Sequence, residues 1–385
     1  MKIAVYHPWI YLKSGLERTI LEIARRSGHE ILIYTSHYDS DATFPELTEF
    51  NITEVNPVSV QRSYGAVLGA AVNILKTRLP GDPDAIVVCC EGVGSFLNVR
   101  NRDKPLINLC FTPLRAVYDM EYRKRHLDTH RSRKWLALII EFGFRWVDRL
   151  LWRAYDRVIC ISETVAERVL AGRLCTREDI VVSYPGIDES GIELATGDKG
   201  FFFVPGRIMW TKNIELAIQA YAHYVKDNER PLDLVIAGMV DDKSRSYLDD
   251  LMRQAADLPG ISFVIGPTDE EMVTMYRDCY ATLFTAFNED LGLTPMEAMS
   301  KGKPVIAVNK GGPREVVSSD ETGLLVDNDP EAFALAMNVL SNDPKMAEKF
   351  GAAGRERVSR FTWHQFVSEF DEIVSQVVSD QSASH

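Results

Sequence analysis

The chain has 385 residues, of which 46% are hydrophobic and 25% charged, an ordinary composition for a soluble globular protein long enough to form two domains. Its formal net charge of −12 argues against broad nucleic-acid binding, because proteins that grip phosphate backbones usually carry a basic excess. The six cysteines form no C-x-x-C pair, so we expect reduced thiols in a cytoplasmic protein rather than disulfides or a zinc site.

The first residues, MKIAVYHP, start an apolar strand-like run directly, and we therefore expect no secretory signal peptide. The most apolar helix-like segment is WLALIIEFGF, which contains Glu141. It is far shorter than the roughly 20 apolar residues that a membrane span requires. The sequence thus predicts a protein that does not cross a membrane, although it can still touch one.

Short runs rich in Val and Ile alternate with helix-like segments along the whole chain. The first half contains KIAVYHP, EILIYTS, AIVVCCEG, LINLCFTP, RVICIS and IVVSYPGI, and the second half contains FFFVPGR, LDLVIAG, ISFVIGP, ATLFTAF, KPVIAV and GLLV. Continuous apolar runs bounded by turn residues are typical of strands that are covered on both faces. Their alternation with helices predicts an α/β protein with parallel sheets.

A composition shift divides this pattern into two doubly wound, Rossmann-like domains. Residues 185–200, PGIDESGIELATGDKG, are rich in Gly and Asp and lack an apolar period, so we place the linker there. We expect an acceptor-binding domain over residues 1–187 and a donor-binding domain over residues 188–365, with a final helix at about 366–380 packing back on the first domain. Ligands of such sheets bind beyond the carboxyl ends of the strands, so the two domains are expected to face each other across one cleft.

The segment GRIMWTKN, residues 206–213, follows the strand FFFVP and carries two cations. Gly206 lets the chain turn close to a ligand, while Arg207 and Lys212 offer a planar fork and a point charge that suit two adjacent phosphates. The alternative interpretation is two solvated surface cations beside a tight turn.

The segment NEDLGLTPMEAM, residues 288–299, follows the strand ATLFTAF and contains Glu289 and Glu297. Pro295 suits the first turn of a helix, and the free N–H groups of that turn, helped by Gly292, predict an anion site. We interpret the pair as one carboxylate for each sugar of a ligand whose phosphates lie between them. A general acid and base of a hydrolase, or an acidic loop before a surface helix, are the alternatives.

Two glycine loops are weaker candidates. The pair Gly311–Gly312 in NKGGPREVV permits close approach of the backbone, which a simple tight turn explains about equally well. Gly15 stands with Ser14 just before a predicted helix, where the loop would be able to close over a ligand.

Together these residues resemble the retaining nucleotide-sugar glycosyltransferases of family 4, which have the GT-B fold. The resemblance covers nearly the whole chain and is strongest over GRIMWTKN, ISFVIGP and EDLGLTPMEAMSKGKPVIAVNKGGPREVV. Its most specific mark is the pair of glutamates separated by seven residues. The stretch LCFTPLRAVYDMEY is in turn similar to a CHTPxRYxWD stretch of mannosyltransferases.

The resemblance implies a role for each matching residue. Arg207 and Lys212 would hold the donor diphosphate and neutralise the leaving group, so that no metal is needed. Glu289 would bind hydroxyls of the transferred sugar and Glu297 the ribose, with retention of the anomeric configuration. Further donor contacts would come from backbone or loop positions, namely Gly15, Gly206, Ile265, Gly266, Asp290, Leu291, Gly292 and Leu293.

One departure from the family pattern concerns the acceptor side. The active-site His of the family corresponds here to Phe111, and no other His lies in the neighbouring sequence. His7, at the end of the first strand, and Asp119 are candidate substitutes, although a His7 that merely packs at a strand end is the simpler interpretation. We hypothesise that Phe111 lines the acceptor or sugar pocket.

Residues 115–157 are locally basic, with eleven Lys or Arg against six Asp or Glu. Trp135, Leu138, Ile139, Phe142 and Trp146 recur in this region at helical spacing. One interpretation is a basic amphipathic surface that contacts an anionic membrane and brings a lipid-linked acceptor to the enzyme. The other is a helix that buries this stripe in the domain core.

The sequence therefore predicts a metal-independent retaining glycosyltransferase that moves a hexose, with mannose favoured, from a GDP- or UDP-sugar to a hydroxyl acceptor such as a glycan or a lipid-linked intermediate. It predicts no other cofactor, no nucleic-acid partner, and a cytoplasmic location, at most peripheral at the inner face of the membrane. The alternatives are a sugar-nucleotide epimerase of the same fold and a nucleotide-sugar-binding protein with little turnover because of Phe111.

Overall fold

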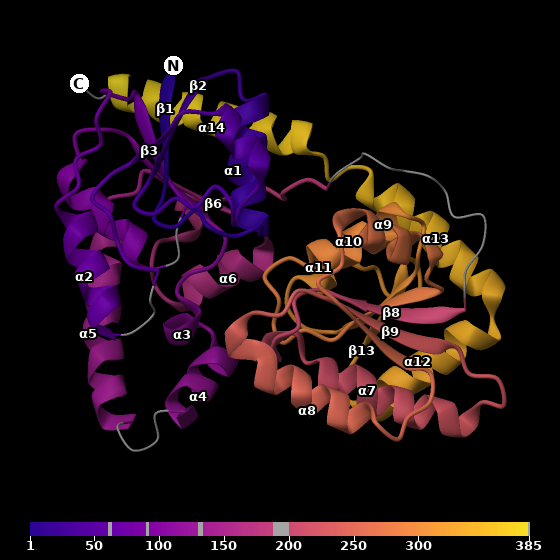
Figure 1. Ribbon diagram of the computed structural model, residues 1–385. Coiled ribbons are helices and arrows are strands. Elements are labelled where there is room, and N and C mark those ends of the chain that lie inside the picture. The colour runs from indigo at the N-terminus through magenta and orange to yellow at the C-terminus, as the bar shows by residue number, and fades with distance from the viewer. Residues whose placement is uncertain (61–63, 90–91, 130–133, 188–199, 384–385) are drawn as a thin grey trace. The chain divides into compact units, whose positions relative to one another are not determined.

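The computed structural model describes residues 1–385 except 61–63, 90–91, 130–133, 188–199 and 384–385. The chain folds into two compact units, drawn in Figure 1: the first comprises Met1–Gly186 and Trp363–His385, and the second comprises Ile187–Thr362. Residues 188–199 of the predicted linker lie outside the described residues.

The first unit is built on a seven-stranded parallel sheet with the order β3-β2-β1-β4-β5-β6-β7. The direction of winding reverses between β1 and β4, as in a doubly wound Rossmann-like sheet. The strands are β1 (Lys2–His7), β2 (Glu30–Thr35), β3 (Ile52–Glu54), β4 (Ala85–Val88), β5 (Leu106–Cys110), β6 (Arg157–Cys160) and β7 (Ile180–Val182).

The sequence analysis missed the edge strand β3. It has only three residues, Ile52, Thr53 and Glu54, and therefore lacks an apolar run from which a strand could be predicted. Its pairing with β2, which places Ile33 opposite Ile52, is set by the neighbouring strand rather than by its own sequence.

The helices of the first unit include one from the end of the chain. The α-helices are α1 (Gly15–Arg26), α2 (Tyr64–Leu75), α3 (Arg115–Tyr118), α4 (Met120–Thr129), α5 (Lys134–Trp152), α6 (Glu163–Ala171) and α14 (Trp363–Ala383); the 3₁₀ helices are η1 (Pro45–Glu49), η2 (Val93–Arg100) and η4 (Arg177–Asp179). Figure 1 shows α14, in yellow, beside α1, in indigo, and the Asp371 carboxylate accepts hydrogen bonds from Ser27 Oγ (2.6 Å) and Gly28 N (2.7 Å). These contacts fix the last helix to the first one.

The second unit repeats the architecture with a six-stranded parallel sheet in the order β10-β9-β8-β11-β12-β13. Its strands are β8 (Phe201–Pro205), β9 (Asp233–Gly238), β10 (Ile261–Ile265), β11 (Ala281–Phe284), β12 (Val305–Val308) and β13 (Gly323–Val326). The winding reverses between β8 and β11. Both units are therefore Rossmann-like, and the predicted α/β fold class with two doubly wound domains is confirmed.

Helices cover both faces of the second sheet (Figure 1). They are α7 (Ile214–Tyr224), α8 (Arg245–Ala255), α9 (Asp269–Asp278), α10 (Leu293–Ser300), α11 (Pro313–Val316), α12 (Pro330–Asn342) and α13 (Pro344–Val358), with the 3₁₀ helices η5 (Trp210–Lys212), η6 (Val225–Asp227) and η7 (Asp242–Ser244). One face of β8 packs Phe202 against Tyr224 of α7, and the other packs Phe203 against Tyr276 of α9. Burial of these large rings is a main source of stability for this unit.

Candidate active site

Lys212 and Glu289 meet at the point where the winding of the second sheet reverses. Lys212 ends η5, directly after β8, and Glu289 lies in the loop after β11, the strand next to β8. The Lys212 Nζ donates to Glu289 Oε2 over 2.7 Å, and both side chains stay partly exposed. The structure thus brings together two residues that are 77 positions apart, in the place where open parallel sheets bind ligands.

The backbone around Lys212 is held by residues that directly follow β11. Thr285 Oγ1 donates to the Lys212 carbonyl over 2.8 Å, and Phe287 N donates to the Thr211 carbonyl over 2.9 Å. Asn213, which follows, adopts a left-handed conformation (φ 50°) that ends η5 and starts α7. The ammonium group of Lys212 also lies 5.5 Å from the centre of the Phe284 ring, a distance at which a cation is attracted to the ring face.

Gly206 lies at the start of this loop, and the position of its carbonyl group requires a second glycine, Gly238. It has φ 128°, a conformation that favours glycine, and the Cβ of any other residue at Gly238 would lie 1.8 Å from its carbonyl oxygen. The ends of β8 and β9 therefore approach more closely than side chains would allow. Gly238 was not singled out in the sequence, because a single Gly at a strand end gives no sign of this contact.

The loop that carries Glu289 packs on the glycine pair Gly311–Gly312. Gly312 N donates to the Glu289 carbonyl over 2.8 Å, and a Cβ at Gly312 would lie 2.3 Å from Leu291 Cα. A Cβ at Gly311 would lie 2.6 Å from the Glu289 carbonyl oxygen. The pair thus has a definite role, which is to let the β12–α11 loop lie against the Glu289 loop.

The helix α10 begins directly after Gly292, whose φ of 100° places it in the left-handed region. Leu291 is buried beneath the loop, while Asp290 and Leu293 are partly exposed. The first N–H groups of a helix have no acceptor within the helix and attract anions. The residues predicted to offer backbone donors therefore directly follow Glu289 at the start of α10, and their contact with a donor stays a prediction.

Glu297 lies one turn into α10 and is accessible to solvent, yet it accepts a hydrogen bond from Tyr276 Oη to its Oε2 over 2.6 Å. The dense protein surroundings raise the pKa of its carboxyl, while the Tyr276 hydrogen bond and the charges of Lys212 and Lys301 act to lower it. Tyr276 was not singled out in the sequence, since nothing in an isolated tyrosine of α9 indicates that it reaches α10.

The ends of β9 and β10 lie farther along the same edge of the sheet. Ile265 is 44% exposed, and Gly266, with φ 66°, donates its N–H to the Gly238 carbonyl over 3.1 Å. Met239 is exposed as well, and its Sδ lies 3.8 Å from where a Cβ of Gly266 would be. The edge thus presents an exposed apolar surface at the residues for which the sequence predicts contact with a base.

Arg207, the other predicted cation, follows Gly206 and is exposed. Its guanidinium has no hydrogen bond or ion pair among the described residues, so it is able to contact a ligand but is not fixed near Lys212. Its predicted role as a diphosphate contact stays a prediction.

His7 lies at the carboxyl end of β1 in the first unit. Its side chain is buried, and its Nδ1 donates to the Cys89 carbonyl, just beyond β4. The hydrogen bond therefore spans the point where the winding of the first sheet reverses. This arrangement favours the interpretation of His7 as a residue packed at a strand end.

Asp119 is buried and caps the start of α4. Its Oδ1 accepts hydrogen bonds from Glu121 N (3.0 Å) and Tyr122 N (3.3 Å), and its Oδ2 lies 3.6 Å from Arg168 Nη2. A carboxylate that accepts helix N–H groups and pairs with an arginine is well explained by structure alone. These contacts weaken its case as a substitute for the family histidine.

Phe111 and Gly15 lie at the carboxyl ends of strands of the first sheet or shortly after them. Phe111 follows β5 directly and is partly exposed, so its ring is not wholly buried in the core. Gly15 is the first residue of α1, where Ser14 Oγ accepts from Leu16 N as the helix cap. The roles predicted for both residues stay predictions.

The apolar stripe of residues 115–157 lies on α5 and faces outward. Trp135 (65% exposed), Ile139 (60%), Phe142 (76%) and Trp146 (63%) follow one another at helical spacing on the outside of the helix. The interpretation that this stripe is buried in the domain core is therefore wrong. We refer to Trp135, Leu138, Ile139, Phe142, Trp146 and Leu150, all exposed, as the outer face of α5.

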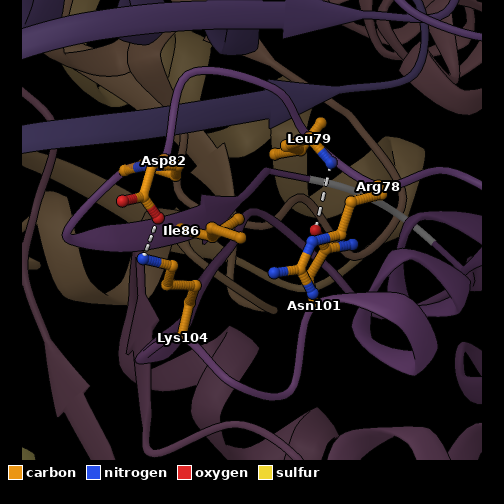
Figure 2. Close-up of a pocket in the computed structure, with 7 residues that line it drawn as sticks. Arg78, Leu79, Asp82, Ile86, Asn101 and Lys104 are labelled. Carbon is orange, nitrogen blue, oxygen red and sulfur yellow. Dashed lines mark hydrogen bonds and ion pairs between the residues drawn. The ribbon is translucent and has the colours of Figure 1, made fainter.

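A small pocket of the first unit lies at the opposite edge of its sheet from His7. It is lined by residues just before β4 and β5, and Figure 2 shows Lys104 Nζ donating to Asp82 Oδ1 (2.5 Å) and Leu79 N donating to Asn101 Oδ1 (3.1 Å). Since ligands of parallel sheets bind at the carboxyl ends, this pocket is not part of the candidate site. Among the described residues no group of three His, Cys, Asp or Glu side chains is arranged to hold a metal ion.

Known protein families match both units of the chain. Residues 13–190 match the family model "Glycosyltransferase Family 4", and residues 188–357 match "Glycosyl transferases group 1". The chain is 26% identical to alpha-1,3/1,6-mannosyltransferase ALG2 of Homo sapiens, over 94% of this chain and 93% of that protein.

Solved structures show the same fold at lower identity. One is the sucrose-phosphate synthase of Thermosynechococcus elongatus, with 18% identity and a TM-score of 0.77 over 99% of this chain and 100% of that one. Another is HepE of Anabaena in complex with UDP and glucose, with 17% identity and a TM-score of 0.72 over 98% of this chain and 100% of that one.

Two doubly wound, Rossmann-like units in one chain are the architecture of the GT-B fold. The chain belongs to the glycosyltransferases of GT-B fold, with a family 4 domain followed by a group 1 domain. The recognition of this family from the sequence is confirmed.

Proposed function

We propose that this glycosyltransferase moves a hexose, mannose in the first instance, from a nucleotide diphosphate sugar to a hydroxyl acceptor, with retention of configuration and without a metal ion. The observation that supports this most directly is the Lys212–Glu289 pair at the switch point of the second sheet, next to the start of α10. The similarity to mannosyltransferases over nearly the whole chain favours mannose.

Each group of the site has a part in this reaction. Lys212, Arg207 and the first N–H groups of α10 neutralise the charge that grows on the leaving diphosphate, which lowers the barrier electrostatically. Glu289 accepts hydrogen bonds from the hexose, and Glu297 from the ribose. The bond from the anomeric carbon to the phosphate oxygen breaks while the acceptor oxygen attacks the same face, and the departing phosphate oxygen takes the acceptor's proton. Catalysis then rests mainly on positioning and charge.

A panel of nucleotide sugars tests the donor site. Thermal shifts with GDP-, UDP- and ADP-sugars should be largest for GDP-mannose and should disappear in Lys212→Ala and in Glu297→Ala. The exposed Lys226, at the far end of α7, supplies a matched control, since Lys226→Ala also removes one lysine charge but should keep the shift. Unchanged shifts in both site variants would show that the donor binds elsewhere.

Measurements of the reaction products distinguish a glycosyltransferase from a binding protein and from an epimerase. With GDP-mannose and a polyprenyl diphosphate-linked oligosaccharide as acceptor, the anomeric configuration of the product, read by NMR, should match that of the donor, and EDTA should leave the rate unchanged. Donor binding with neither transfer nor donor hydrolysis would instead indicate a binding protein, for which Phe111 in place of the family histidine is the favouring observation. Conversion of the donor without any acceptor would indicate an epimerase.

We further propose that the first unit contacts an anionic membrane through the outer face of α5. Within the described part of the chain, no helix has the length and apolarity needed to pass through a bilayer. The side chains that form the outer face are apolar, whereas Glu141, on another side of α5, pairs with Arg123 (2.8 Å) and Arg145 (2.9 Å). Exposed apolar surface of this kind marks an interaction site.

The composition of the face and its surroundings favours lipid as the occupant. Two exposed tryptophans, Trp135 and Trp146, suit the boundary between head groups and acyl chains. Exposed cations stand at both ends of α5, Lys134 and Arg153, where they can meet anionic head groups. A lipid-linked acceptor would then reach the enzyme within the membrane surface.

Sedimentation with liposomes tests the contact. The wild-type chain should bind vesicles of 30% phosphatidylserine in phosphatidylcholine, and Ile139→Ser together with Phe142→Ser should lower the bound fraction by about tenfold. Leu335→Ser, at a similarly exposed apolar position of α12 in the second unit, is the matched control and should bind like the wild type. Equal binding by all variants, or a concentration-dependent dimer that the double variant abolishes, would exclude the membrane contact.

A further inference from the structure

Tyr276 of α9 is joined to Glu297 of α10 by a short hydrogen bond inside the second unit. Its side chain is 5% exposed, and its ring packs edge-to-face on Phe203 of β8, with 5.2 Å between the ring centres. The Tyr276 hydroxyl donates to Glu297 Oε2 over 2.6 Å. The direction of this bond is fixed, since a carboxylate can only accept.

The Tyr276 hydroxyl is also influenced by Thr294, which lies one turn before Glu297 on α10 and acts to lower the pKa of the phenol. Burial of the phenol and the negative charge of Glu297 hold the pKa of Tyr276 well above its usual value, so the phenol keeps its proton and stays a donor. Glu297 of α10 is therefore tied to a buried ring of α9.

The tie leaves part of the Glu297 carboxylate available. Glu297 is accessible to solvent, and only its Oε2 is engaged by Tyr276. A glutamate that is free to rotate loses side-chain entropy when it binds a ligand, whereas one held in place by a neighbour has already lost it. A carboxylate held at one oxygen can offer the other to a ligand without searching for its orientation.

We infer that Tyr276 is a positioning residue for the donor: it holds the Glu297 carboxylate in the orientation that accepts the ribose hydroxyls of a nucleotide diphosphate. The inference rests on the proposed function, which gives Glu297 its ribose contact. It adds a residue on another helix, outside the segments that carry the family resemblance.

Tyr276→Phe removes the hydroxyl and keeps the ring that packs on Phe203. By calorimetry with GDP and UDP, the variant should bind the preferred nucleotide about tenfold more weakly than the wild type, because a hydrogen bond to a charged group is lost. With the sugar donor, KM should rise by a similar factor while kcat changes by less than about twofold. The control is Tyr280→Phe, which loses a hydroxyl that donates to the Leu340 carbonyl (2.5 Å) away from the site and should bind normally.

Nucleotides that lack a ribose hydroxyl distinguish positioning from a general loss of structure. The wild type should bind 2′-deoxy-GDP or 2′-deoxy-UDP more weakly than the parent nucleotide, and with these ligands the penalty of Tyr276→Phe should shrink to below about threefold. The pH profile is a second readout. Because the Tyr276 hydrogen bond lowers the pKa of Glu297, nucleotide binding by the variant should weaken at a higher pH than in the wild type as the solution is acidified.

The outcomes separate the inference from the function on which it rests. If Glu297→Ala weakens nucleotide binding but Tyr276→Phe does not, or if Tyr276→Phe weakens the parent and deoxy nucleotides equally, the positioning role is wrong and the donor site stands. If Glu297→Ala and Lys212→Ala both bind GDP and UDP like the wild type, the donor site itself is wrong, and the inference falls with it.

Discussion

Side chains are placed unusually at two surfaces, in opposite ways. Charged side chains are partly buried at the carboxyl edge of the second sheet, whereas apolar side chains are exposed on the outer face of α5 in the first unit. At the edge, charged groups such as Lys212 and Glu289 lie partly buried among protein atoms. On α5, Trp135 and Phe142 lie in solvent while Glu141 and Asp148 turn inward. Departures of this kind are expected where a protein binds something, since the partner supplies the missing environment. The comparison therefore supports the two proposed binding surfaces, which have opposite chemistry.

The edge depends on backbone packing, so the largest effect is expected there. In Gly312→Ala the new Cβ would lie 2.3 Å from Leu291 Cα, and backbone cannot move aside cheaply. We expect the second unit to lose about 3 kcal/mol of stability and the chain to lose most of its donor affinity. Chemical unfolding and calorimetry with GDP would measure both. Normal stability together with normal affinity would show that the Glu289 loop is not held by the glycine pair.

The next largest effect is expected at Asp148, whose carboxyl points inward from α5. Burial raises the pKa of Asp148 to about 7, although hydrogen bonds from Tyr118 and Trp152 and the charge of Arg149 act to lower it. A carboxyl whose pKa is raised by folding binds its proton more tightly in the folded state, so its contribution to stability is present at low pH and is lost as the pH rises to about 7. In Asp148→Asn the amide oxygen can still accept the hydrogen bond from Tyr118, but the side chain cannot ionise, so stability is not lost as the pH rises.

We therefore compare the free energies of unfolding of Asp148→Asn and of the wild type. The difference in favour of the variant should be about 2 kcal/mol larger at pH 8 than at pH 5. Unfolding of both proteins, followed through tryptophan fluorescence at the two pH values, measures the difference. A difference between the proteins that is the same at both pH values would mean that Asp148 is already ionised in the folded chain at pH 5.

Gly143 of α5 should respond to an added Cβ in the opposite way to Gly312. A Cβ at Gly143 would meet nothing within 4 Å, and the residue lies inside a helix, where alanine is preferred to glycine. Gly143→Ala should raise stability by about 0.8 kcal/mol. A loss of stability would show that the exposed side of α5 is covered in the free chain, for instance by a second copy, and sedimentation velocity would then detect the assembly.

The smallest effect is expected for the most exposed ring of the outer face. Phe142→Ser should change stability by less than about 0.5 kcal/mol, because the ring has few protein contacts to lose. The fully buried Phe370 of α14 provides the comparison within the same unit, where Phe370→Ala should cost about 3 to 5 kcal/mol. Similar costs for the two variants would contradict the outward orientation of α5.

The sequence predicts the edge of the second unit well because its signals are local. Each strand there is a continuous apolar run, and each loop that follows carries its functional residues within a few positions, as in GRIMWTKN and NEDLGLTPMEAM. The parallel order of β8 and β11 then brings Lys212 to Glu289, which strand alternation alone already suggests. Two doubly wound domains follow from the same alternation.

The features that the sequence does not predict depend on tertiary contacts. The period of α5 indicates an apolar face but not its direction, which is set when Glu141 and Asp148 find partners on α3 and α4. Tyr276 reaches Glu297 only because α9 and α10 lie on the same side of the sheet. Gly238 is needed only because β8 and β9 end side by side.

The position of α14 has a consequence for the order in which the chain folds. Residues 363–383 are synthesised after the whole second unit, yet they complete the first unit: Phe366, Phe370 and Val374 are buried in it, and Ser183 Oγ donates to Glu369 over 2.6 Å. During synthesis the second unit is whole before the first one has received its final helix. The sheet of the first unit therefore stays partly uncovered until the second unit has been synthesised.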